Sequence, residues 1–272
     1  MPQIINTNIP SLNAQRNLNT SQGSLNTALQ RLSSGLRVNS SKDDAAGLAV
    51  AEKMNAQSRG MVVAMRNAND GLSLAQTAEA GMNVIGDHLQ RMRELAVQAA
   101  SGQYDSDNRA ALNTEYQQLA SEINRVISAT NFNGQTLLDG KFENGVAFQV
   151  GATATSESQI DISIAELSMA AGQIDGSTGA NALDAMTTLD GLIDTINNNR
   201  AALGAIQNRF EGVLTQLSAA QENTEAARSR IMDADYASET AKLARAQVLQ
   251  QAGVAMLSQA NALPQNVLSL LR

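Results

Sequence analysis

Long stretches of the chain carry apolar residues at separations that alternate between four and three positions. The first series consists of Met61, Met65, Ala68, Leu72, Ala75, Ala78, Met82, Ile85, Leu89, Met92, Ala96 and Ala99. A shorter series consists of Leu112, Tyr116, Leu119, Ile123 and Val126, and the longest runs from Leu189 to Ile231 with Arg200 and Thr224 as polar interruptions. A mean spacing near 3.5 residues is typical of helices that wrap around one another. The pattern predicts a mainly α fold built as a long antiparallel helical bundle or coiled coil.

The segment between the second and third series follows another pattern. Val146, Phe148 and Val150 alternate with polar or small residues, and so do the isoleucines at 160, 162 and 164. The linker between the two runs is rich in Gly, Thr and Ser, so a small β-hairpin is predicted near residues 146–164. Residues 170–181 are mostly Gly, Ala, Ser and Thr, which indicates a loop or a site that tolerates insertion.

The two ends of the chain carry almost no charge. Arg16 is the only charged side chain in residues 1–30, and residues 246–271 have none. Apolar residues still recur at helical intervals, and they form a predicted assembly seam of Leu18, Leu25, Leu29, Leu32, Leu36, Val248, Met256 and Leu263. Because burying an unpaired ion is costly, an uncharged amphipathic segment suits a site crowded by neighbours. We expect the ends to pair with each other, and to be disordered in a lone monomer until partners order them.

Composition narrows the function. The chain has 272 residues, of which 43% are apolar but only 3% aromatic, with no Trp, so the core consists mostly of small side chains that suit helices packed side by side. A formal charge of -7 and a pI near 4.8 argue against nucleic-acid binding. We therefore expect a structural or interaction protein with no nucleic-acid partner.

The candidate chemistry is equally sparse. A single histidine, His88, and the absence of cysteine exclude disulfides, thiolate zinc sites, Cys nucleophiles and two-histidine metal motifs. A site made of carboxylates alone is left open, but neither clustered acids nor a Gly-rich phosphate loop locates one. We expect no catalytic residue, no cofactor and no metal, and hence no enzyme.

Neither a conventional secretory signal nor a membrane span is predicted. Residues 1–13 lack a basic region followed by an apolar one. Residues 246–271 are uncharged, but repeated Gln, Asn and Ser and one Pro make them too polar to cross a bilayer. No membrane insertion is therefore expected.

Several motifs resemble those of a known family. The N-terminal half contains LSSGLRVN at residues 32–39, KDDAAGLA at 42–49, RELAVQ at 93–98 and NFNG at 131–134. The C-terminal half contains LGAIQNR at residues 203–209, ARSRI at 227–231, DADY at 233–236 and PQNVLSLLR at 264–272. Together these motifs resemble the bacterial flagellins over roughly residues 1–140 and 186–272. They are long enough to be specific.

The resemblance implies an architecture and a set of partners. Residues 1–42 and 232–272 would form an inner terminal coiled-coil domain in the core of a filament, and residues 43–231 a helical bundle domain with the hairpin. Large outer domains, which many relatives insert in mid-chain, would be absent. The implied function is a secreted, extracellular subunit of a helical homopolymer used for motility. Implied further partners are an export chaperone, the filament cap and hook-junction proteins.

The resemblance also implies recognition by host immune receptors. Arg91, Leu95 and Glu115 match the positions that the vertebrate Toll-like receptor for flagellin contacts in related proteins. The alternative is structural: Asp87 and Arg91 would form a surface pair, Leu95 would extend the buried stripe, and Glu115 would be solvated. The C-terminal leucines match positions that cytosolic inflammasome receptors read in some relatives, although filament packing is their primary expected role. These leucines are Leu268, Leu270 and Leu271.

Two other helical classes share parts of this pattern. A hook-associated junction protein has similar terminal segments but departs further from the motifs quoted above. A signalling coiled coil would normally carry membrane spans or a charged heptad surface throughout. A flagellin with an inserted metallopeptidase would need a histidine pair and an extra domain, and the chain has neither.

Overall fold

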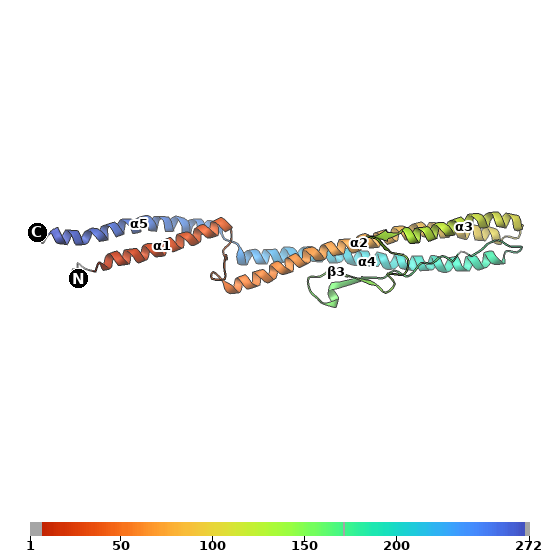
Figure 1. The fold of residues 1–272 in the computed structure, drawn as a ribbon, viewed down its shortest axis with the longest axis horizontal. Helices are drawn as coiled ribbons and strands as arrows, with labels where there is room; N and C mark the ends of the chain where they lie inside the picture. The colour runs from red at the N-terminus through yellow and green to blue at the C-terminus, as the bar shows by residue number, and fades with distance from the viewer. Residues whose placement is uncertain (1–6, 171, 270–272) are drawn as a thin grey trace. The chain divides into compact units, whose positions relative to one another are not determined.

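A computed structural model of the chain describes the backbone of residues 7–170 and 172–269, and the side chains up to residue 262 (Figure 1). The helices are α1 (Ile9–Ser34), α2 (Ala45–Ala100), α3 (Ser106–Ala129), α4 (Ala180–Met232) and α5 (Tyr236–Ser269). The strands are β1 (Asn131–Phe132), β2 (Gln135–Thr136), β3 (Val146–Gln149) and β4 (Gln159–Ile162), with a short 3-10 turn at Ser156–Ser158. The predicted mainly α fold with a small hairpin and paired termini is confirmed.

The chain divides into two compact units, which are described separately. The first unit contains residues Met1–Ala56 and Asn223–Arg272, and the second contains Gln57–Glu222. The expected division at residues 42 and 232 concerns the layers of a filament, and it stays a prediction.

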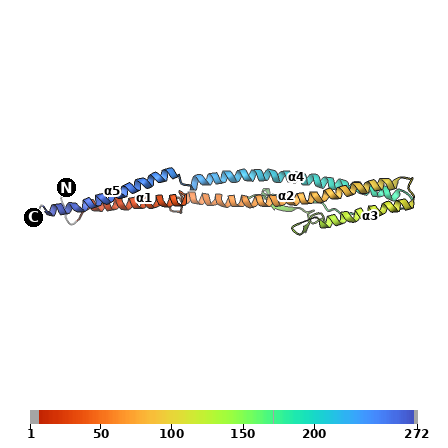
Figure 2. The same ribbon diagram turned by 90° about the horizontal axis from the view of Figure 1, so that it is seen from above.

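In the first unit, α1 and α5 lie side by side and antiparallel (Figures 1 and 2). Asn8 caps the start of α1, because its side-chain oxygen accepts a hydrogen bond from the backbone N–H of Ser11 at 3.1 Å. Gly35 ends the helix in the left-handed conformation, with φ of 70°, which costs glycine little because it has no Cβ. A small hydrophobic cluster of Val38, Ala51 and Met232 packs the start of α2 against the end of α4.

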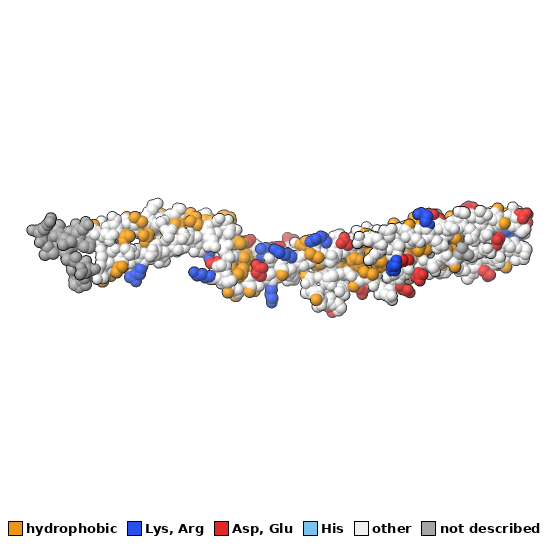
Figure 3. All heavy atoms as spheres, viewed as in Figure 1, with side chains coloured by type: hydrophobic (Ala, Val, Ile, Leu, Met, Phe, Trp, Pro, Cys, Tyr) orange, Lys and Arg blue, Asp and Glu red, His pale blue; other side chains and the backbone are white. Residues whose placement is uncertain are grey.

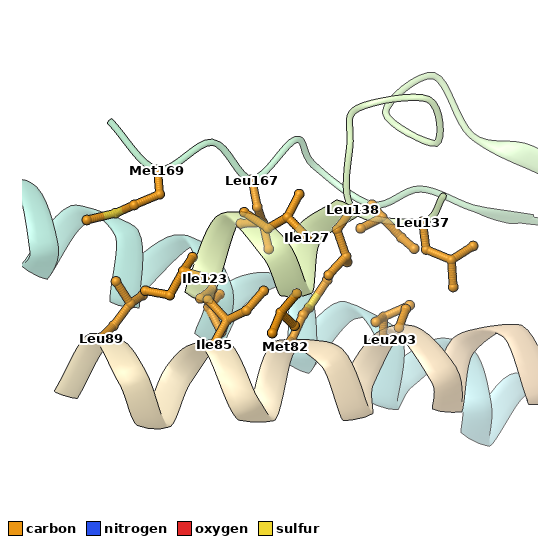
Figure 4. Packing of buried hydrophobic residues seen from close by; sticks show 14 of the residues in the cluster. Met82, Ile85, Leu89, Ile123, Ile127, Leu137, Leu138, Leu167, Met169 and Leu203 are labelled. Atoms are coloured by element: carbon orange, nitrogen blue, oxygen red, sulfur yellow. The ribbon is translucent and has the colours of Figure 1, made fainter. Parts of the chain in front are cut away.

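The second unit is built around a bundle of α2, α3 and α4. Its fully buried side chains follow the apolar series read from the sequence, and Figure 4 shows several of them meeting between the helices. The largest include Met82, Ile85, Leu89, Met92, Tyr116, Ile123 and Phe210. Side-chain bonds join the antiparallel helices α2 and α4, with Arg93 Nε donating to Asp190 at 2.6 Å and Gln207 donating to Glu79 at 2.8 Å.

The hairpin lies where the alternation predicted it. Strands β3 and β4 are antiparallel, with Val146 opposite Ile162 and Phe148 opposite Ile160. Phe148 meets Phe210 of α4 edge-on, with ring centroids 6.1 Å apart, and so attaches the hairpin to the bundle. A second sheet, β1 and β2, turns at Asn133 and Gly134, both with positive φ; this two-residue strand pair was not predicted.

The residues after the hairpin form an extended strap, comprising residues 163–179 apart from 171, rather than a featureless loop. Its apolar side chains are buried in the bundle: Ile164, Leu167, Met169 and Ile174 are all less than 9% exposed. Amide side chains of α3 hold its backbone, because Gln117 Nε2 donates to Gly172 O at 2.7 Å and Asn113 Oδ1 accepts from Ile174 N at 3.1 Å. The expected loop at 170–181 is therefore partly ordered, and α4 begins at its end.

Candidate assembly surface

The paired ends α1 and α5 share a regular seam. On α1 the less exposed positions are Ser11, Ala14, Leu18, Ser21, Leu25, Ala28 and Leu32. On α5 they are Glu239, Leu243, Ala246, Gln250, Gly253, Leu257 and Ala260. Both sets alternate in steps of three and four, as a coiled-coil seam requires. Because many of these side chains are small or polar, one copy of the chain buries little apolar surface in this seam.

Polar contacts fix the register of the seam. At one end Asn8 Nδ2 donates to Ala260 O at 2.8 Å and Ser11 Oγ donates to Asn261 Oδ1 at 2.8 Å. In the middle Gln250 donates to Gln22 at 2.7 Å. Since each contact depends on one alignment of the helices, a shift of one helical turn would leave these groups without partners.

The other end of the seam holds a buried carboxylate. Glu239 is 4% exposed and lies 2.7 Å from Lys242 Nζ and 3.4 Å from Arg31 Nη1. The hydrogen bond from Lys242 and the nearby positive charge of Arg31 lower the pKa of Glu239 below its usual 4.5, against the opposing effect of burial. The carboxylate is therefore ionised and paired at neutral pH.

Three of the eight residues of the predicted assembly seam lie in this pairing seam, three face away from the partner helix, and Leu36 lies just beyond the end of α1. Leu25 is buried, and Leu18, Leu32 and Leu36 are half-buried. Leu29, Val248 and Met256 instead face away from the partner helix, with exposed fractions of 48%, 64% and 63%. The physical reason is that Gln250 and Gly253 occupy the seam of α5, positions that a search for large apolar residues passes over. Leu263 and Leu268 belong to α5 but their side chains lie outside the described ones, and Leu270 and Leu271 lie outside the described residues.

The outward faces of both helices are unusually apolar. Among the described side chains of α1 and α5, seven large aliphatic ones are about half or more exposed: Ile9, Leu12, Leu29, Val248, Leu249, Val254 and Met256. Figure 3 shows apolar patches over this part of the molecule, among polar atoms and few charged ones. Repeated exposed apolar patches of this kind are characteristic of a face that partners cover.

The turn between α1 and α2 is hydrogen-bonded to the turn between α4 and α5. Leu36 and Asp233 form an isolated antiparallel bridge, and Ala234 N donates to Gly35 O at 2.9 Å. Next to it, the carboxylate of Asp43 accepts from the backbone N–H groups of Asn39 and Ser40, which lowers the pKa of Asp43. Both turns are therefore held by main-chain groups, and the residues LSSGLRVN and DADY lie together.

The receptor candidates lie on the bundle of the second unit. Arg91 of α2 reaches Glu115 of α3, with Nη2 2.9 Å from Oε1, and also pairs with Glu94 at 2.9 Å. The hydrogen bonds that Arg91 donates to these carboxylates raise the pKa of Arg91. Leu95 is only 1% exposed and belongs to the core, as the structural alternative expected. The expected pair of Asp87 with Arg91 is replaced by the two pairs with glutamate.

Arg109 is a structural residue that the sequence did not single out. It is 4% exposed, and its guanidinium donates only to backbone carbonyls: to Ala99 at 2.8 Å, Ser101 at 3.2 Å, Ser177 at 3.1 Å and Gly176 at 3.4 Å. It thus ties the end of α2 and the strap to the first turn of α3. The sequence contained one indication that Arg109 is buried. It stands three residues before Leu112, so it extends the apolar series of α3 by one position toward the N-terminus.

The described part of the chain was tested for two further features, a metal cluster and a membrane span. No group of three His, Asp or Glu side chains able to hold a metal occurs there. None of its helices has the length and hydropathy of a membrane span. These features define a class of protein: a structural helical subunit whose two ends pair and present uncharged apolar faces.

Comparison with known proteins gives the family. The model of the bacterial flagellin N-terminal helical region matches residues 5–143, and that of the bacterial flagellin C-terminal helical region matches residues 186–271. A flagellin of Halalkalibacterium halodurans is 45% identical over 274 residues, covering 99% of this chain and all of the relative. Flagellin FlaB2 of Treponema pallidum is 42% identical over 287 residues, with 99% and 100% covered. The chain belongs to the bacterial flagellin family.

Family membership gives the function at a general level. The chain is a structural subunit of the extracellular flagellar filament, which serves motility, and it is not an enzyme. It is also a short member. Flagellin A of Vibrio cholerae is 34% identical over an alignment of 376 residues that covers 98% of this chain and 99% of the relative, so its additional residues are internal insertions.

Proposed function

We propose that the outward faces of α1 and α5 are the surface through which copies of the chain assemble, and that residues 1–42 and 232–272 form the filament core. The observation that carries the proposal is the exposure of large apolar side chains on helices that have almost no charge. Fully burying one such side chain stabilises an assembly by roughly 1.5–3 kcal/mol. Since these side chains are already partly covered, each contributes somewhat less.

The thin seam supports a coupling of folding to assembly. An isolated pair of helices whose seam has five leucines among small and polar residues buries too little to repay the ordering of some sixty residues at about 1–2 kcal/mol each. Neighbouring copies supply the missing burial. The ends therefore order fully only within the filament, which keeps the monomer export-competent and makes growth cooperative.

The same surface is the natural site for the transient partners that the family resemblance implies. These partners are an export chaperone, a filament cap and hook-junction proteins. Each binds subunits whose ends are not covered by other copies of the chain. An uncharged apolar face on α5 suits this purpose, because it is accessible before assembly and protected afterwards.

Seeded polymerisation tests the proposal. Filament fragments are mixed with monomer, and elongation is followed by light scattering and negative-stain microscopy. Val248→Asp places a charge on the outward face of α5 and should abolish elongation without changing the helical content of the monomer. Leu183→Asp alters a residue of the second unit that is similarly exposed, at 57%, and should elongate normally.

Deletions provide a second arm of the same experiment. Removing residues 1–30 or 246–272 should leave the bundle of the second unit folded and unable to polymerise. Unimpaired growth of either deletion variant, or of Val248→Asp, would remove the ends from the assembly mechanism.

A second candidate function is recognition by the host Toll-like receptor for flagellin. The exposed Arg91–Glu115 pair supports it, because it joins α2 and α3 into one charged surface whose two members are each about half exposed. Leu95 contributes indirectly, because it packs in the core and so fixes the position of this charged surface. For Leu268, Leu270 and Leu271 the primary proposed role is packing in the filament. Recognition by inflammasome receptors is a secondary proposed role.

Receptor activation in a reporter cell line tests this candidate. Arg91→Ala should lower the response to monomer about tenfold or more, as expected when a charged pair at the centre of an interface is lost. Arg125→Ala, which removes a similar exposed pair with Glu122 on α3, is the matched control and should respond like the wild type. Equal responses from all three proteins would eliminate the receptor surface.

A further inference from the structure

A groove runs along one side of the α1–α5 pair within the first unit. It encloses about 680 Å³. Thr20, Ser24 and Thr27 of α1 form one wall, and Lys242, Arg245 and Leu249 of α5 form the other. The side chains of the α1 wall are small, and a Cβ added at neighbouring Gly23 would meet nothing within 4 Å. Small side chains allow another backbone to approach closely, so the groove has room for a further element.

The α1 wall offers acceptors and not donors. Each hydroxyl donates its single proton to the carbonyl four residues earlier: Thr20 to Arg16 at 3.0 Å, Ser24 to Thr20 at 3.1 Å, and Thr27 to Gly23 at 3.1 Å. A hydroxyl that has donated its proton within the helix keeps an oxygen lone pair for a partner. These hydroxyls are therefore neutral acceptors, and the only charge on the α1 wall is that of Arg31 at one end of the groove.

The groove as a whole is positive. Three cations line it, Arg31 of α1 and Lys242 and Arg245 of α5, against the single carboxylate of Glu239. Arg31 and Lys242 already lie on that carboxylate, at 3.4 and 2.7 Å. Arg245 has no ion-pair partner among the side chains that the structure describes. An uncompensated guanidinium thus lines the groove next to the uncharged end of α5.

The charge of the two units differs in sign. The first unit has ten Lys and Arg against seven Asp and Glu, a net +3. The second has nine Lys and Arg against nineteen Asp and Glu, a net -10. Two grooves facing each other would bring like charges together. A groove facing an acidic surface of another copy would bring unlike charges together, and such a contact between different patches generates an open polymer.

We propose that this groove docks an acidic surface of a second copy of the chain, with a carboxylate of that copy pairing with Arg245. The inference rests on the proposed function, since it names one contact of the assembly. The proposed function attributes assembly to apolar burial alone, whereas the groove adds a charged, salt-sensitive contact that selects a head-to-tail arrangement.

Charge reversal in full-length protein tests the contact. Elongation of wild-type seeds is measured for wild type, Arg245→Glu and Lys53→Glu at 50 mM and 1 M NaCl. Lys53 is an exposed lysine of the same unit outside the groove, so its variant changes the net charge equally. The critical monomer concentration of Arg245→Glu should rise about tenfold at low salt, and the difference should shrink to about twofold at 1 M, where charges are screened within roughly 3 Å.

A steric variant supports the same reading independently of charge. Ser24→Leu extends a branched side chain into the groove from the α1 wall and should block elongation at both salt concentrations. Circular dichroism of each monomer confirms that the helices are retained.

The outcomes separate the two proposals. If wild type elongates and Arg245→Glu behaves like wild type, or Lys53→Glu is impaired as strongly as Arg245→Glu, the groove contact is overturned while assembly through the apolar faces stands. If Val248→Asp also elongates, the proposed function falls and the groove contact falls with it. A loss confined to Arg245→Glu and Ser24→Leu supports the groove.

Discussion

Replacing Arg109 by methionine should destabilise the bundle strongly. Methionine keeps most of the apolar stem, so the change isolates the guanidinium, which is buried and donates to four carbonyls from two segments. Two of these carbonyls belong to Ala99, in the last turn of α2, and Ser101, just beyond it. Without the guanidinium the Ala99 carbonyl loses its side-chain donor in a buried site, and the Ser101 carbonyl keeps only the backbone N–H of Tyr104 at 3.3 Å.

The expected size follows from those bonds. A hydrogen bond to a charged group contributes about 1.5–3 kcal/mol net, and long bonds contribute less. The bonds at 2.8 and 3.1 Å are counted as strong and those at 3.2 and 3.4 Å as weak. The two strong bonds together contribute about 3–6 kcal/mol of unfolding free energy, and the two weak ones add a smaller amount. Arg109→Lys keeps the charge but cannot reach all four carbonyls, so it should lose about half as much.

Urea unfolding followed by circular dichroism measures the loss, and hydrogen exchange locates it. Exchange should accelerate most at the start of α4, because Arg109 holds the strap that precedes it. Arg125→Met is the matched control: its guanidinium is paired with Glu122 but is 65% exposed, and removing it should cost less than about 1 kcal/mol. A loss below about 1 kcal/mol for Arg109→Met, similar to this control, would show that the carbonyl contacts contribute little.

Two further predictions concern packing and pH. Gly71→Ala should destabilise the bundle by about 1–3 kcal/mol in thermal unfolding, because its Cβ would lie 2.7 Å from Phe210 and 3.2 Å from Phe148. Gly86→Ala has open space around it and should instead stabilise the bundle by about 0.5–1 kcal/mol. A change of the same sign in both variants would contradict the packing argument. Because Lys242 of the same helix and, to a smaller extent, Arg31 of α1 lower the pKa of Glu239, the contribution of the carboxylate is present above 4.5 and is lost as the pH falls through the lowered value. In assembled filaments, the hydrogen-exchange protection of α1, corrected for the pH dependence of intrinsic exchange, should therefore decrease on acidification in wild type and change less in Glu239→Gln; identical pH profiles would exclude this carboxylate.

The sequence was a good guide to the bundle and a poorer one to the strap. The 3.5-residue series placed Met82, Ile85 and Leu89 in the core, and all three are buried. A long helix repeats the same requirement every turn, so a single misplaced residue does not obscure its pattern. The strap carries no such repetition. Leu167 and Ile174 are buried because they pack into the core of the bundle, and no local pattern predicts that.

The sequence located the uncharged ends but not the faces through which their two helices pair. The absence of charge from residues 1–30 and 246–271 marked both ends as segments that become buried. It did not show which side of each helix meets the other. Val248 and Met256 are the larger apolar residues of α5, yet they face outward, while Gln250 and Gly253 meet α1.

The sequence by itself determined the helices, the hairpin, the family and the uncharged ends, because each is written locally as a period, an alternation, a motif or a missing charge. Only the tertiary structure decided which faces pair, where Arg109 finds its carbonyls, and which cation is left without a carboxylate. Those outcomes depend on complementarity between residues more than sixty positions apart, such as Arg31 with Glu239 or Arg109 with Ser177. A helical period gives the direction of a side chain about its own axis, and it contains no information about the partner that it meets.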